Sequence, residues 1–104
     1  NIRVIKMSIT TATEGNKHVV KIQGRFDFGV QAEFRQAYEE VAGTGSFVLD
    51  FAGTQYMDSS ALGMLLLLRD YAGGDSARIE LKNCQAEIKN ILEISNFQKL
   101  FSIS

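Results

Sequence analysis

Two apolar stretches separated by a short polar segment constrain the fold of this chain most strongly. Residues 46–51 are mainly apolar and have the length of a strand that neighbours cover on both faces. Residues 62–68 are strongly apolar and predict a buried helix. A buried strand followed directly by a buried helix indicates an α/β fold, in which helices pack on a sheet.

Other segments complete this pattern on both sides. Residues 8–13 and 18–26 predict two strands of a hairpin, joined by the turn-prone residues 14–17. An apolar stripe at helical spacing then predicts an amphipathic helix that ends near residues 43–45. The stripe consists of Val30, Phe34, Ala37, Tyr38 and Val41.

The second half of the chain continues in the same alternation. The buried helix is expected over about residues 59–71, followed by a loop at 73–75 and a half-buried strand at 77–82. A last helix is predicted from about Gln85. The apolar side chains that should pack beyond it are Phe97, Leu100 and Phe101.

The predicted order is therefore β-β-α-β-α-β-α, an α/β fold with a mixed four-stranded sheet and helices mainly on one face. The loops that leave parallel strands meet at the carboxyl edge of the sheet. Residues 27–28 follow one strand there, residues 54–60 follow the next, and Asn83 and Cys84 follow the third. Asp27 and the segment 58–60 should therefore form one surface.

Length and charge exclude several classes of protein. The 104 residues predict one domain over 1–104, in which Met7 is a candidate natural start and residues 1–6 are a remnant or an extra N-terminal segment. With 11 basic and 12 acidic residues, direct binding to nucleic acid is not expected.

No apolar stretch is long enough for membrane insertion. The lone Cys84 fits a reducing cytoplasm and is expected to be an unreactive packing residue.

No residue pattern points to catalysis, a metal site or a cofactor. His18 is the only histidine, and the topology places it at the sheet edge opposite the serines of segment 58–60, so it cannot act as their base. Glu39 and Glu40 are helix neighbours that point apart and should be solvated. The glycine pairs lack the lysine of a phosphate-binding loop.

Two features of the apolar helix bear on function. Leu62, Leu65 and Leu66 are expected in the core, whereas some of a second set of side chains are expected to face a partner. That second set is Met64, Leu67 and Leu68. Asp58 is a good N-cap, and Ser59 and Ser60 occupy the first turn. These residue types also favour an ordinary helix start, so local pattern alone leaves both interpretations open.

Four segments resemble STAS domains, specifically the small bacterial anti-sigma factor antagonists. The signature of this family is matched by two runs of the chain, which resemble it in order: Val48-Leu49-Asp50-Phe51, followed by Met57-Asp58-Ser59-Ser60-Ala61-Leu62-Gly63. Gly24-Arg25-Phe26-Asp27 resembles the family's Gly-Xaa-Xaa-Asp loop, and Ile91-Leu92-Glu93-Ile94-Ser95-Asn96-Phe97 resembles its closing helix and turn. The likeness covers essentially the whole chain. Ala61 stands where the family usually has glycine, and Phe26 and Phe28 are less usual there.

The resemblance implies a non-enzymatic protein that acts by partner switching. The unmodified form binds an anti-sigma factor, often a serine kinase, and thereby frees a sigma factor. Serine phosphorylation releases the protein, and a serine phosphatase restores it. The family's phosphorylation site maps to Ser60, with Ser59 as the second choice. The expected partner-binding residues are Asp27, Phe28, Met57, Asp58, Ser59, Ser60 and Met64.

One alternative stays open at this point. Some STAS domains are constitutive accessory or scaffold subunits of transport or signalling complexes. In such a protein the same surface would dock its partner without any phosphorylation.

Overall fold

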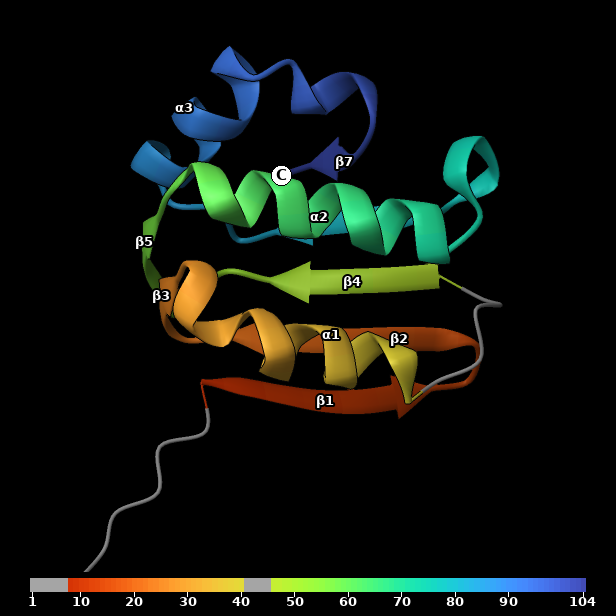
Figure 1. Ribbon diagram of the computed structural model, residues 1–104. Coiled ribbons are helices and arrows are strands. Elements are labelled where there is room, and N and C mark those ends of the chain that lie inside the picture. The colour runs from red at the N-terminus through yellow and green to blue at the C-terminus, as the bar shows by residue number, and fades with distance from the viewer. Residues whose placement is uncertain (1–7, 41–45) are drawn as a thin grey trace, which may run out of the picture.

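A mixed five-stranded sheet lies at the centre of the structure, a computed structural model that describes residues 8–40 and 46–104 (Figure 1). Its strands, in spatial order, are β1 (Ile9–Glu14), β2 (Lys17–Ile22), β4 (Ser46–Asp50), β6 (Ile79–Lys82) and β7 (Ser102–Ile103). β1 and β2 form the predicted antiparallel hairpin, and every other neighbouring pair is parallel. The expectation of four strands was wrong, because β7 has only two residues and such a short strand shows no alternating pattern.

The strand predicted over residues 18–26 is interrupted, because the chain leaves the main sheet within it. Gly24 has a φ of +81°, in the left-handed region that glycine adopts without steric cost. After this turn, β3 (Gly24–Phe26) pairs in parallel with β5 (Thr54–Met57) in a separate two-stranded sheet. β5 lies where the sequence suggested only a connecting segment.

Helices α1 (Gln31–Glu39) and α2 (Ser59–Tyr71) lie next to each other on one face of the sheet, as predicted (Figure 1). α3 (Ala86–Ile94) contacts β5. Three 3-10 turns complete the description: η1 (Phe28–Val30), η2 (Gly74–Ser76) and η3 (Phe97–Lys99).

Helix α1 begins at Gln31, one residue after Val30, the first residue of the predicted apolar stripe. Val30 belongs to η1, while Phe34 and Tyr38 form the buried side of α1. The predictions for Val41 and the glycine-rich residues 43–45 lie outside the described residues, as do those for residues 1–6 and Met7.

The buried side of α2 differs from the expected one. Its fully buried residues recur at helical spacing and are Ala61, Met64, Leu65 and Leu68. Leu62 is half-buried. Leu66 was expected in the core but is 39% exposed, and Leu67 is 52% exposed. Of Met64, Leu67 and Leu68, the helix side chains expected to face a partner, only Leu67 is therefore exposed.

Aromatic side chains join the small sheet to the main core. The ring of Phe26 in β3 lies 5.0 Å from that of Phe34 and 5.8 Å from that of Phe51, measured between ring centroids. After α3, Phe97 and Phe101 are buried and stacked at 5.4 Å, as predicted. Leu100 is 38% exposed, so its predicted packing there was wrong.

Thr54 links the two sheets through a buried hydrogen bond. Its side chain is fully buried, and its Oγ1 donates to the carbonyl oxygen of Ile22 at 2.7 Å. The backbone N–H of Gly24 also donates to the carbonyl oxygen of Gly53 at 2.9 Å. These bonds fix where β3 and β5 start relative to β2.

We expect Thr54→Val to lower the free energy of unfolding by about 1–3 kcal/mol, because it removes the donor from a buried carbonyl oxygen. Thr11→Val makes the same chemical change on the exposed side of β1 and is the matched control, with little expected effect. Urea unfolding followed by circular dichroism measures both variants. Equal stability of the two would contradict the assigned role of the hydrogen bond.

Candidate functional site

The ends of β3 and β5 place two aspartates side by side. In the parallel register Arg25 pairs with Tyr56 and Phe26 pairs with Met57. The residues that follow, Asp27 and Asp58, therefore leave neighbouring strands at the same edge. This confirms the expected proximity of Asp27 to the segment 58–60.

Asp58 and Ser60 form a tight pair at the start of α2. Asp58 is the N-cap, and its Oδ1 accepts hydrogen bonds from the backbone N of Ser60 at 3.0 Å and from Ser60 Oγ at 2.5 Å. The bond from the Ser60 side chain is the main cause that lowers the pKa of Asp58. Desolvation opposes this effect, while backbone amides and the charge of Arg25 support it. Ser60 is half-buried, whereas Ser59 is exposed.

Asp27 has a corresponding role at η1. Its Oδ1 accepts a hydrogen bond from the backbone N of Gly29 at 2.9 Å, and its Oδ2 accepts one from Arg25 Nε at 3.0 Å. The Arg25 guanidinium lies over the ring of Tyr56, with Cζ 4.0 Å from the ring centroid. The hydrogen bond to Asp27 is the main cause that raises the pKa of Arg25.

The sequence alone assigns no role to Arg25 or Tyr56. The available signal was the spacing of Arg25 and Asp27, two residues apart, which puts both side chains on one side of a strand. The contact with Tyr56 depends on the pairing of β3 with β5 and has no local signal.

The remaining predicted residues divide into exposed and buried groups. Phe28 is 68% exposed beside Asp27, and Tyr56, which is not among the predicted residues, is 40% exposed. Met57 and Met64 are each only 4% exposed and lie in the core. These two methionines therefore support the surface from below and offer little area for direct contact.

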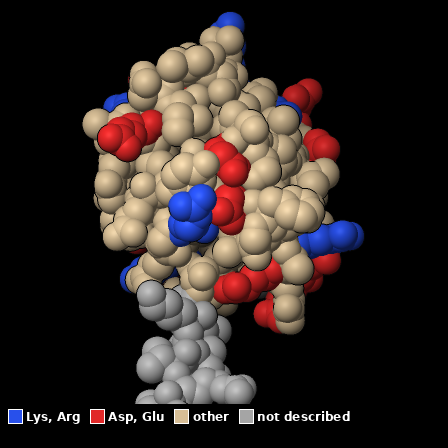
Figure 2. All heavy atoms as spheres, turned by 60° about the vertical axis from the view of Figure 1, so that its left-hand side comes forward, with Lys and Arg blue, Asp and Glu red and all other residues tan. Residues whose placement is uncertain are grey.

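Figure 2 turns this side of the molecule toward the viewer. Near its centre a basic side chain lies against acidic ones, and much of the surrounding surface is uncharged. Mixed charge within an uncharged surround suits contact with a protein better than contact with nucleic acid.

The third loop at this edge is tied to β4. Asp50 Oδ1 accepts hydrogen bonds from the backbone N of Ala52 at 2.9 Å and from Asn83 Nδ2 at 3.0 Å. Burial raises the pKa of the neighbouring Cys84 thiol to about 11. Such a thiol is protonated near neutral pH, which supports its interpretation as an unreactive packing residue.

Other polar groups lie away from this edge. His18, near the start of β2, packs against Phe47 with ring centroids 5.2 Å apart, and its Nδ1 lies 3.3 Å from Thr13 Oγ1. The serines instead follow β5 at the opposite edge. The described part of the chain holds no cluster of three or more His, Cys, Asp or Glu residues arranged for a metal ion.

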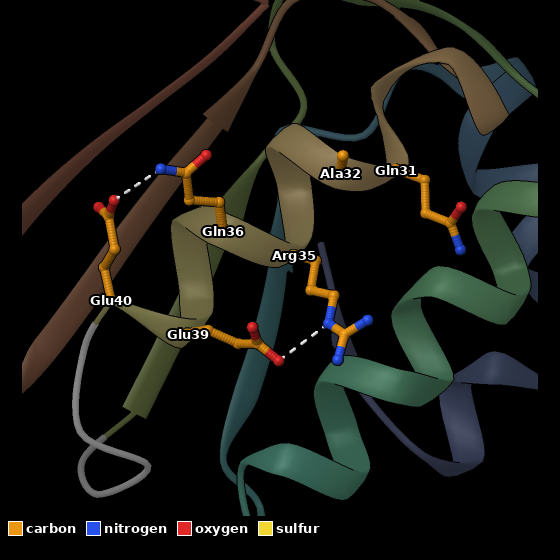
Figure 3. A pocket seen from close by; sticks show the side chains of 6 residues that line it. All are labelled: Gln31, Ala32, Arg35, Gln36, Glu39 and Glu40. Atoms are coloured by element: carbon orange, nitrogen blue, oxygen red, sulfur yellow. Dashed lines mark hydrogen bonds and ion pairs between the residues drawn. The ribbon is translucent and has the colours of Figure 1, made fainter.

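The outer face of α1 has a shallow hollow of about 510 Å³, but its side chains form ordinary helix pairs (Figure 3). Arg35 Nε donates to Glu39 Oε2 at 2.9 Å, and Gln36 Nε2 donates to Glu40 Oε1 at 3.2 Å. Glu39 and Glu40 therefore have separate partners and point apart, as predicted (Figure 3). This arrangement indicates a solvated helix face.

Comparisons with known proteins agree with this architecture. A family model described as "Mlab, STAS domain" matches residues 9–102. A STAS-domain containing protein of Pseudomonas aeruginosa (strain UCBPP-PA14) is 54% identical, over 94% of this chain and 100% of that protein. Among the described residues, no helix is long and apolar enough to cross a membrane.

Two solved structures share the fold at low sequence identity. An anti-sigma factor antagonist from Mycobacterium paratuberculosis has a TM-score of 0.75 and 15% identity, over 91% of this chain and 82% of that one. The Bacillus cell fate determinant SpoIIAA in the phosphorylated form has a TM-score of 0.64 and 16% identity, over 92% of this chain and 90% of that one.

The lowered pKa of Asp58 predicts a pH dependence. A carboxylate stabilised in the folded state contributes stability above its unfolded pKa of about 3.9, and this contribution is lost as the pH falls through the lower folded pKa. Asp58→Asn keeps an N-cap but removes the charge. The decrease in the free energy of unfolding of Asp58→Asn, relative to the unmodified chain, should therefore be largest near neutral pH and shrink below about pH 4.

Urea unfolding at a series of pH values measures this difference. Asp70→Asn, at an exposed position of the same helix, is the control. A stability difference for Asp58→Asn that stays constant between neutral and acidic pH would contradict the prediction.

Proposed function

The chain belongs to the STAS domain family, and from this premise we propose that it is an anti-sigma factor antagonist that acts by partner switching. The unmodified protein binds an anti-sigma factor and frees a sigma factor. Phosphorylation of Ser60 by a serine kinase, which is often the anti-sigma factor itself, releases the protein. A serine phosphatase returns it to the binding form.

The observation that carries this proposal is the placement of Ser60. Its hydroxyl lies in the first turn of α2, half-buried, and donates to Asp58 beside the paired Asp27. A modification here changes the charge of the surface on which both aspartates lie. Ser59 is more exposed, but its side chain has no such link to Asp58 among the hydrogen bonds of the described residues.

A phosphate at this position suits the fold and opposes a docked partner. It adds about two negative charges near pH 7. At a helix start it meets free amide groups and a favourable dipole, so the domain should remain folded. The same phosphate replaces the Oγ–H that donates to Asp58 and lies next to that carboxylate. Repulsion and bulk would then disrupt a desolvated interface over this surface.

The surface itself has the composition of a protein-binding site. Phe28 and Tyr56 supply exposed aromatic area, while Asp27, Asp58 and Arg25 supply charge. Aromatic residues and arginine are enriched at interface centres. Phe28 is the exposed aromatic side chain adjacent to Asp27 and is the expected anchor.

The solved relatives support this function by analogy. One is described as an anti-sigma factor antagonist and another was solved in a phosphorylated form. Under this proposal the protein works without enzymatic activity and acts in the cytoplasm on protein partners alone.

We expect Ser60→Asp to weaken binding to the cognate anti-sigma factor at least about tenfold, which is ~1.4 kcal/mol, because it places a fixed negative charge at the interface. Ser60→Ala should bind close to the unmodified affinity. Ser76→Asp, which makes the same change at the exposed turn η2, is the control. Isothermal titration calorimetry measures binding, and circular dichroism verifies the fold. Equal affinity of Ser60→Asp and the unmodified chain would refute the switch.

Incubation with ATP and a serine kinase that copurifies with the protein from its own cells should add one phosphate, located at Ser60 by mass spectrometry. Ser60→Ala should remain unmodified, whereas Ser59→Ala should still accept the phosphate. A chain that binds its partner stably yet never accepts phosphate would instead favour a constitutive STAS accessory or scaffold subunit.

A further inference from the structure

Among the described residues, Arg25 places a cation at the junction of the two aspartates. It pairs with Asp27 through Nε at 3.0 Å, and its guanidinium lies over Tyr56, the residue two positions before Asp58. Its charge is also among the causes that lower the pKa of Asp58, the carboxylate that accepts the hydrogen bond from Ser60. Arg25 therefore contacts Asp27 and Tyr56 directly, and its charge also stabilises the carboxylate of Asp58.

The contacts of Arg25 leave it free to reorient. Its side chain is 65% exposed, and the ion pair with Asp27 uses only Nε. A guanidinium has several further N–H donors in a planar fork that matches the oxygens of a phosphate. Exposed ion pairs of this kind are weak, so their exchange for a stronger partner costs little.

A phosphate on Ser60 would supply that stronger partner. The modification removes the hydroxyl hydrogen that now bonds Asp58 and places about two negative charges next to the carboxylate. Asp27 and Asp58 would then both lie near the new anion, with Arg25 as the neighbouring cation. Arginine forms short, charge-assisted pairs with phosphate groups.

We propose that Arg25 is the residue that responds to phosphorylation of Ser60: its guanidinium leaves Asp27 and pairs with the phosphate. This inference rests on the proposed modification of Ser60. Position 25 is one of the unspecified positions of the Gly-Xaa-Xaa-Asp loop, so this role belongs to the present chain and not to the motif. Asp27 keeps its bond from the Gly29 amide but loses its cation. The face of Tyr56 that Arg25 covers becomes free.

The consequence is a change on both sides of the surface. Phosphorylation would add charge at Ser60 and, at the same time, uncover the charge of Asp27. A partner that recognises the Arg25–Asp27 pair and the covered ring would lose both contacts together. Ser60→Asp, which has one charge and a shorter side chain, would reproduce this rearrangement only in part.

The test uses the full chain with phosphoserine placed at position 60 during translation by amber-codon suppression. Phosphorus NMR then follows the second pKa of the phosphate in this protein and in the same protein carrying Arg25→Gln. A neighbouring guanidinium favours the doubly charged phosphate, so Arg25→Gln should raise this pKa by about 0.5 or more. Arg25→Lys should return it toward the value of the phosphorylated chain without that substitution.

Arg35→Gln is the matched control, because Arg35 is equally exposed and also pairs through Nε, here with Glu39 on α1. It should leave the phosphate pKa unchanged. An unchanged pKa in Arg25→Gln, or an equal rise in Arg35→Gln, would overturn the inference. Since the phosphate is installed without kinase or partner, this result is independent of the binding and kinase experiments. Loss of binding on phosphorylation without an effect of Arg25 would mean that the phosphate acts by repulsion and bulk alone.

Discussion

The parallel pairing of β3 with β5 is the constraint on which the candidate functional edge depends. These two short strands form a sheet of their own, and their register alone brings Asp27 next to Asp58. Phe26 anchors β3 in the aromatic core, and the buried hydroxyl of Thr54 connects β5 to the end of β2. Without these anchors the two aspartates would lie on independent loops. Asp27 would then no longer be held beside Asp58 and Ser60, and the three residues would not form one surface.

The two aspartates give the edge its dual character. Each carboxylate satisfies a backbone amide of the turn that follows it, so each is part of the fold. Each also accepts a hydrogen bond from a side chain that can change: Arg25 for Asp27 and Ser60 for Asp58. The backbone bonds keep the surface in shape while the side-chain bonds are exchanged. Under the proposed switch, this division would let a charged modification alter recognition without unfolding the domain.

The sequence predicted most of the main sheet and the helices, because periodicity and helix caps are local signals. The Asp58 cap and the start of α2 at Ser59 are examples. The break at Gly24 was missed, since its conformation is decided by pairing with a segment far along the chain. The exposure of Leu66 was missed because a helix that is apolar on all sides has no periodic contrast to orient it. The role of Arg25 was missed because its contact with Tyr56 depends on the pairing of β3 with β5, two strands that are far apart in the sequence.

The alternation along β3 has an evolutionary consequence. Arg25 is exposed, while the next residue, Phe26, is fully buried and anchors the strand. The outer position can therefore mutate while the inner one preserves the architecture. Under the proposed function, a substitution at position 25 after a gene duplication would let two daughter proteins diverge in their choice of partner, and cross-talk between them would fall at little cost in stability, because an exposed ion pair contributes little.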